Sequence, residues 1–169
     1  MVDYGRFMHR TPAPSRQNLD KTCAVVESSL AEMKIIVSRV SSYYQPLAGA
    51  DKYRLLYLGS NIYDFYLLAE DCLLHIARTI DRWVPASLDW RARLIKLMQS
   101  PFPEKRPPVI STATALLLSQ CLSLFLNFHH QCATLTPARI IKLLESLGPL
   151  CSQLEEELTA FTRLIKPKA

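Results

Sequence analysis

Residues 111–131, STATALLLSQCLSLFLNFHHQ, form the stretch that decides the fold. The stretch contains no Asp, Glu, Lys or Arg and is apolar on nearly every side of a helix. A helix of this kind belongs in the middle of a helical bundle or in a membrane. Its length also suits a membrane span, but the other long segments have the amphipathic pattern of helices in water. The pattern therefore predicts a buried central helix in an all-α protein, in preference to a membrane span.

Two long segments before this stretch have the apolar periodicity of helices. Within residues 16–44, apolar side chains recur at alternating spacings of three and four residues. These side chains are Cys23, Val26, Leu30, Met33, Val37, Val40 and Tyr44. A second stripe runs through residues 50–82 and consists of Leu58, Ile62, Phe65, Ala69, Leu73, Ile76 and Ile80. Each stripe predicts a long helix with one buried face.

The segment that leads into the central stretch is short and basic. Residues 87–99 predict a short helix with an apolar side at Trp90 and Leu94 and a basic side at Arg91 and Arg93. Residues 100–108, SPFPEKRPP, contain four prolines, which disfavour regular structure. We therefore expect a basic loop directly before the central helix.

The last helix begins at Thr136 and Pro137, because Thr is a good N-cap and Pro a good first helical residue. Its stripe consists of Ile140, Leu144, Leu147, Cys151, Leu154, Leu158, Phe161 and Ile165. The phase of this stripe continues through Gly148 and Pro149, so we expect one helix with a kink there. The glutamates of residues 155–157 are expected in solvent.

The total length of 169 residues suits one domain that buries roughly 70% of its unfolded surface. Together, the predicted helices indicate an up-and-down bundle of four long helices and one short helix over residues 16–166. Residues 1–15 are expected to be a flexible arm, in solvent or in contact with a partner, and residues 167–169 a tail. The first and last helices leave room for a dimer interface.

Charge and cysteine usage narrow the class of protein further. The net charge of +5 leaves a phosphate-rich or acidic partner such as nucleic acid open. The five cysteines stand singly, without a CxxC pair, so neither a disulfide framework nor a zinc site is expected. The N-terminus lacks the apolar region of a signal peptide. We therefore predict a cytoplasmic protein without a metal or cofactor.

The adjacent histidines His129 and His130 are the first place to look for chemistry. They are either ordinary polar residues favoured at a helix C-terminus, or acid–base groups that titrate near neutrality. In RNA cleavage such a base would take the proton of a ribose 2′-OH while a cation offsets the charge of the phosphate. Asn127 is a further candidate contact. The candidate cations are Arg91, Arg93, Lys105, Arg106 and Arg139.

Two carboxylates, Glu70 and Asp71, stand in the middle of the second helix beside its apolar stripe. A carboxylate beside a core has to be exposed, paired or functional. We expect exposure for both residues, with pairing or function as the alternatives. His75 stands alone and is expected to be a satisfied interior or partly exposed histidine.

Several short motifs occur together in a recognisable order. They are YLLAE at residues 66–70, IARTID at 76–81, WRARL at 90–94, RPPVIS at 106–111 and TPARI at 136–140. In order and spacing, residues 20–165 resemble the HepT-like branch of the HEPN superfamily. The resemblance implies a helical bundle that pairs into a homodimer. It also implies that active members are metal-independent endoribonuclease toxins whose partner is a minimal nucleotidyltransferase antitoxin.

The catalytic motif of that family is an Arg, four to six further residues, and a His, often followed two residues later by a Tyr. His129 matches the His best, and His130 is the adjacent option. The Arg would fall at residues 122–124, where this chain has Leu, Ser and Leu. The Tyr would fall at Gln131 or Cys132. The motif is therefore degenerate in this chain.

Three hypotheses follow from the resemblance and the degenerate motif. The leading one is a HepT-like protein of a toxin–antitoxin or defence-type module that binds a partner protein or RNA without cleaving it. The alternative is an active metal-independent endoribonuclease that uses His129 or His130 and an arginine from elsewhere. The third is a plain helical RNA-binding domain. A side chain near His129 from one of four arginines would favour the endoribonuclease, namely Arg78, Arg91, Arg93 or Arg106.

Overall fold

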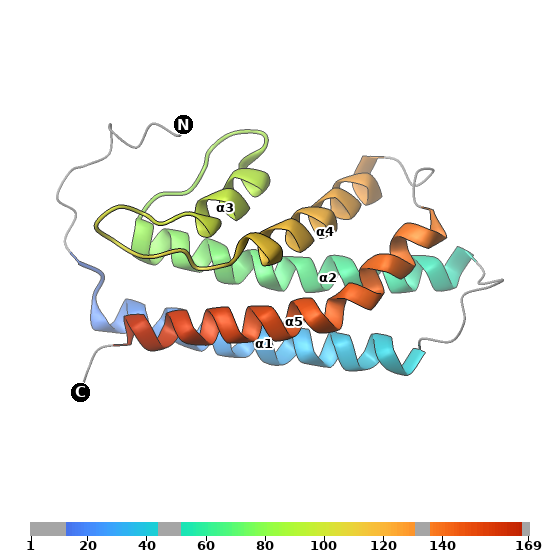
Figure 1. The fold of residues 1–169 in the computed structure, drawn as a ribbon, viewed down its shortest axis with the longest axis horizontal. Helices are drawn as coiled ribbons and strands as arrows, with labels where there is room; N and C mark the ends of the chain where they lie inside the picture. The colour runs from blue at the N-terminus through green and yellow to red at the C-terminus, as the bar shows by residue number, and fades with distance from the viewer. Residues whose placement is uncertain (1–12, 44–51, 131–135, 167–169) are drawn as a thin grey trace.

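The computed structural model describes residues 13–43, 52–130 and 136–166. Over these residues the chain folds into five α-helices, with a π-helical segment after the second and no strand, which confirms an all-α bundle. The elements are α1 (Arg16–Tyr43), α2 (Lys52–Ile76), η1 (Ala77–Asp81), α3 (Trp90–Gln99), α4 (Thr112–His130) and α5 (Pro137–Ile165). Successive long helices run in alternating directions (Figure 1).

The helix at the centre of the bundle is α2. It lies between α1 and α5 on one side and α3 and α4 on the other (Figure 1), and it contacts all four. The expectation that the uncharged α4 is the central helix is wrong, because α4 has an outer face in which Leu116 is 61% and Leu126 is 44% exposed. A helix without charges need not be enclosed on all sides by its own chain.

The apolar stripes form the core as the sequence predicts. All seven stripe residues of the second helix are buried, and the stripe of α5 is buried from Ile140 to Phe161. In α1 the stripe is buried from Cys23 to Val40 except for Val37, which is partly buried against the core. Tyr44, the last residue of the predicted stripe, lies outside the described residues. One face of each helix is thus removed from water, and apolar burial is the main favourable term in folding.

Helix α5 is continuous across Gly148 and Pro149 and bends along its length (Figure 1). Because proline lacks the backbone N–H and its ring crowds the preceding turn, a proline inside a helix causes a kink. This confirms the predicted single helix. Glu157 in the same helix differs from the prediction, because it is partly buried and accepts a hydrogen bond from Thr114 Oγ1 at 3.0 Å.

The end of the second helix and the start of the third differ from the sequence prediction. The α-helical part of the second helix ends at Ile76, and η1 carries the chain on to Asp81. Arg82 then takes a left-handed conformation with φ of 54°, which turns the chain away from the helix axis. The third helix begins at Trp90, three residues later than the expected Ser87.

Most of the predicted N-terminal arm and the predicted tail, residues 167–169, lie outside the described residues. Among the helices that the structure describes, none is both long and apolar enough to cross a membrane.

Candidate functional site

One arginine reaches the surface of α4 from the neighbouring short helix. Arg91, in the first turn of α3, lies with its guanidinium carbon 4.8 Å from the ring centroid of Phe125 in α4. The same carbon lies 4.5 Å from the ring centroid of Trp90. Both positions suit a cation–π interaction. We define the Arg91 site as the side chains that gather at this point, which are Tyr63, Tyr66, Glu70, Trp90, Arg91 and Phe125.

A buried carboxylate holds Arg91 in place. The Nε atom of Arg91 lies 2.9 Å from Oε2 of Glu70, and the side chain of Glu70 is 9% exposed. The contact is an ion pair without the alignment of a hydrogen bond, since Nε has no aligned acceptor among the described residues. The Arg91 side chain remains 31% exposed. The structure therefore corrects the expectation that Glu70 is exposed, whereas its neighbour Asp71 is exposed as predicted.

The same carboxylate oxygen also accepts a hydrogen bond from Tyr66, whose hydroxyl lies 2.8 Å from Oε2 of Glu70. Burial raises the pKa of Tyr66 far above its ordinary value, and the negative charge of Glu70 adds to this shift. Tyr66 therefore keeps its proton and acts as a donor to Glu70. Its role is to position the carboxylate, since a phenol that keeps its proton offers no phenolate to act as a base.

Phe125 is fixed by two tyrosines of α2. Its ring stacks on Tyr63 with centroids 4.8 Å apart and an angle of 2° between the planes. It also lies tilted against Tyr66, with centroids 5.6 Å apart. Offset and tilted aromatic pairs of this kind are favourable beyond their buried area. The platform under Arg91 is thus built from α2 and α4 together.

The predicted catalytic residues His129 and His130, and the predicted contact Asn127, belong to the last turn of α4. Their side chains lie outside the described part of the structure, so their roles stay predictions. Along the chain, His129 follows Phe125 by four residues, about one helical turn. Elsewhere in the described ranges, no group of three His, Cys, Asp or Glu side chains gathers as a metal site would require.

Arg93, another predicted phosphate contact, is on the same short helix but faces water. Its side chain is 60% exposed, and its Nε lies 2.9 Å from the carboxylate of Asp89. Ion pairs between exposed side chains contribute little to stability. Arg93 is therefore accessible, but no other helix holds its guanidinium in place within the described ranges.

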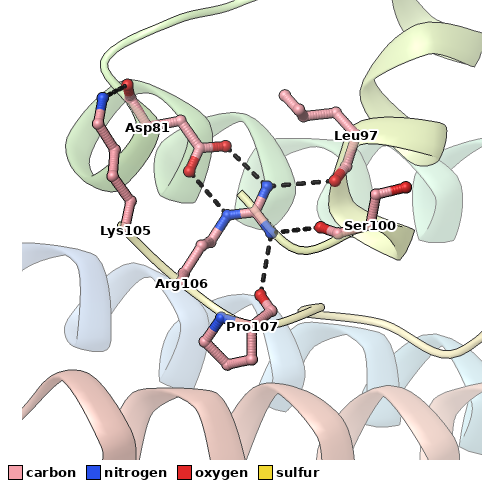
Figure 2. A network of polar contacts seen from close by, with 6 residues as sticks. All are labelled: Asp81, Leu97, Ser100, Lys105, Arg106 and Pro107. Atoms are coloured by element: carbon pink, nitrogen blue, oxygen red, sulfur yellow. Dashed lines mark hydrogen bonds and ion pairs between the residues drawn. The ribbon is translucent and has the colours of Figure 1, made fainter. Parts of the chain in front are cut away.

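The predicted contacts Lys105 and Arg106 lie by the C-terminal end of α3, where Arg106 contacts Leu97 and Ser100 (Figure 2). Arg91 belongs to the first turn of that helix. The Arg106 side chain is 1% exposed, and it forms a two-pronged ion pair with Asp81, whose side chain is 0% exposed. Its remaining N–H groups bond to the carbonyl oxygens of Leu97, Ser100 and Pro107. A guanidinium has five N–H donors, and all five are used here.

Lys105 also serves this network, because its Nζ donates to the backbone oxygen of Asp81 at 2.6 Å (Figure 2). Burial raises the pKa of Asp81, and the guanidinium of Arg106 opposes that shift. The Asp of IARTID and the Arg of RPPVIS are thus partners that join η1, α3 and the loop before α4. Sequence reasoning singled out both motifs without recognising that they bind each other.

A second arginine reaches α4 from the opposite neighbour. Arg139, in the first turn of α5, donates from Nη2 to the hydroxyl of Ser123 at 2.7 Å. Ser123 is one of the three positions at which the family motif would have its Arg. The sequence marked Arg139 as one candidate cation among five, and only the packing of α5 on α4 distinguishes it.

Comparison with known proteins identifies the family of the chain. A family model described as HepT-like protein matches residues 57–165. No curated protein and no solved structure matches the chain. The matched range covers more than half of the chain and contains every residue of the Arg91 site, together with Asp81, Arg106 and Arg139. The chain therefore belongs to the HepT-like family of the HEPN superfamily.

Proposed function

We propose that this protein is the HepT-like component of a toxin–antitoxin or defence-type module, and that it binds RNA at the Arg91 site. Membership of the family supports a module of this type. The main observation in support of RNA binding is the position of Arg91, whose guanidinium lies against Phe125. Phe125 precedes His129 by about one helical turn. Although α4 contains no arginine of its own, α3 brings one to its surface.

The Arg91 guanidinium has the properties of a phosphate contact. Glu70 occupies its Nε side, and the two terminal nitrogens have no acceptor among the described residues. Two parallel N–H groups match two phosphate oxygens, which is why Arg is the preferred residue for phosphate recognition. The aromatic rings of Trp90 and Phe125 keep this charge in one place without neutralising it.

Cleavage is the further step within this proposal. In it, His129 takes the proton of a ribose 2′-OH, and the 2′-oxygen attacks the adjacent phosphorus. The bond to the 5′-oxygen of the next nucleotide breaks, and that oxygen receives a proton from His130 or water. Arg91 offsets the extra negative charge of the phosphate in the transition state.

The second candidate is a binding module that does not cleave RNA. It is favoured by the pairing of Arg91 with Glu70, which already neutralises much of the arginine's charge. It is also favoured by the absence of Arg and Lys from residues 111–131. In this case the bundle would hold RNA or the nucleotidyltransferase antitoxin that the family resemblance implies.

The proposal includes a homodimer in the cytoplasm. The outer face of α4 carries Leu116, Ser119 and Leu126, all exposed and uncharged. Two exposed leucines on one uncharged helix face are the feature that supports an interaction surface here, and a two-fold dimer would pair this face with itself. The four cysteines within the described ranges are buried and free, as suits a reducing compartment.

The experiment that tests the proposal combines binding and cleavage of a mixed single-stranded RNA pool in the presence of EDTA. We expect Arg91→Ala to weaken RNA binding by about ten-fold or more, because a charge-assisted hydrogen bond is lost. Lys96→Ala, which removes one exposed charge from the same helix, is the matched control. Equal binding by Arg91→Ala and wild type would refute the Arg91 site.

Cleavage in the same assay separates the two candidates. If the wild type cleaves RNA and the His129→Ala/His130→Ala variant does not, the protein is an endoribonuclease. If the folded wild type binds RNA but leaves it intact, the protein is a binding module. The circular dichroism spectrum of each variant shows whether the helices remain formed.

A further inference from the structure

Arg139 is a cation at the surface of α4, and no carboxylate of the described ranges pairs with it. Among the residues that the structure describes, its only hydrogen-bond partner is the hydroxyl of Ser123, 2.7 Å from Nη2. It differs in this respect from Arg91 and Arg106, which each contact a buried carboxylate. A partly buried guanidinium that lacks an anion is costly. Its position therefore favours the binding of an anionic ligand, which would supply the counter-ion that Arg139 lacks among the described residues.

The position of Arg139 in its own helix is also unfavourable. It belongs to the first turn of α5, which contains no acidic residue. The N-terminal end of a helix carries a partial positive charge and favours negative side chains. A positive side chain here costs free energy, and the hydroxyl of Ser123 returns only a neutral contact. The hydrogen bond does hold one edge of the guanidinium still and leaves the other N–H groups for a ligand.

Arg139 and Arg91 contact opposite sides of α4. Their neighbours in that helix, Ser123 and Phe125, are two residues apart and so differ in direction by about 200° around the helix axis. Both neighbours lie within about two turns of His130. A single RNA strand that contacts both arginines and passes on the C-terminal side of Ser123 and Phe125 would cross α4 close to the adjacent histidines.

We propose that Arg139 is a second phosphate contact, and that Arg139 and Arg91 together hold one single-stranded RNA across the C-terminal part of α4. The inference rests on the proposed function, since it assigns a further residue to the same RNA. Ser123 is the positioning residue that orients Arg139. The two arginines then bind phosphates on either side of the nucleotide that passes the histidines.

The test is binding of a fluorescein-labelled, mixed-sequence single-stranded RNA, measured by fluorescence anisotropy at several KCl concentrations. Arg139→Gln is expected to weaken binding by about ten-fold or more. It is also expected to reduce the slope of log K against log salt by about 0.7, the value for one lost phosphate contact on a single strand. Arg139→Lys keeps the charge, so its slope stays that of wild type while its affinity falls by a smaller factor.

Two further variants separate a phosphate contact from a structural brace. Lys142→Gln removes an exposed charge from the next turn of α5 and is expected to leave affinity and slope near those of wild type. Ser123→Ala is expected to weaken binding by a few-fold without a change of slope, because the charge remains. Thermal melting of each variant reports any loss of stability, and Arg139→Lys keeps the test valid if Arg139→Gln fails to fold.

The outcomes distinguish this inference from the proposed function. If Arg91→Ala weakens binding and Arg139→Gln behaves like Lys142→Gln, Arg139 only braces α5 against α4 and the inference is overturned. If Arg139→Gln weakens binding and Arg91→Ala does not, the RNA does not span both arginines, and that result overturns the Arg91 site as well. If the wild type binds no RNA, both proposals fail.

Discussion

Arg91 and Arg106 lie near opposite ends of one short helix, yet their surroundings assign them different tasks. Arg106 is enclosed and uses all five of its N–H groups within the protein. Arg91 keeps 31% of its side chain exposed and has terminal nitrogens free for a ligand among the described residues. At the residue scale, the number of unused donors separates the structural Arg106 from Arg91, for which we propose a ligand.

Removal of Arg106 should destabilise the fold strongly. Arg106→Met leaves the carboxylate of Asp81 buried without its partner, which costs about 3–5 kcal/mol of unfolding free energy. Urea denaturation measures this loss. Arg93→Met, at an exposed ion pair, should change the same quantity by less than about 0.5 kcal/mol. The double variant Arg106→Met/Asp81→Leu should recover much of the loss, and no recovery would contradict a pairing-based explanation.

The buried thiols should be unreactive in the folded protein. Burial raises the pKa of Cys72 to about 11 and that of Cys121 to about 12. At pH 8 both groups therefore remain almost entirely protonated, and the thiolate is the reactive form. We expect Ellman's reagent to leave both unmodified until denaturant is added, as peptide mapping would show. Rapid modification of Cys121 in the native protein would show that α4 opens readily.

At the scale of elements, α5 contains a glycine at a position where the helical backbone does not require one. Gly148 is helical, and a Cβ atom built on it meets nothing within 4 Å apart from its chain neighbours and the backbone of its own helix. It lines an open groove between α1 and α5, together with Val37, Val40, Leu144 and Leu147. The helix therefore has room for a side chain at this position.

Gly148→Ala should stabilise the protein by about 0.5–1 kcal/mol, because alanine loses less backbone entropy than glycine in a helix. The midpoint of thermal unfolding, compared with wild type, measures the gain. A lower midpoint would mean that the bend next to Pro149 depends on a backbone geometry that only glycine provides.

At the scale of the whole molecule, the outer face of α4 is the feature that a single chain leaves unexplained. Leu116 and Leu126 are exposed there, on a helix without charges. In a monomer they would stand in water, whereas in the proposed homodimer they would be buried. The same face lies beside Ser123 and Arg139, so the dimer would bring two copies of the second phosphate contact near one another.

The protein should be a dimer in solution, and charges on this face should dissociate it. Leu116→Glu/Leu126→Glu is expected to halve the mass in light scattering without loss of helicity, because both side chains are exposed in the single chain. Leu164→Glu, at a 63% exposed leucine of α5, is the matched control and should leave the mass unchanged. A monomeric mass for the wild type would contradict the homodimer.

The sequence by itself determined the helices, the buried stripes, the kink in α5 and the family. All of these depend on local periodicity, on proline chemistry or on motif order, which are properties of the chain read along its length. It also drew attention to Arg91 and Arg139, but only as members of a longer set of cations.

Only the tertiary structure decided which residues meet. In the structure, α2 rather than α4 is the central helix. Asp81 pairs with Arg106, 25 residues further along the chain. Glu70, which the sequence predicts to be exposed, is buried and contacts Arg91. The physical reason is that burial and ion pairing depend on distances between helices. Periodicity shows which face of a helix is apolar, but it does not show which neighbour covers that face.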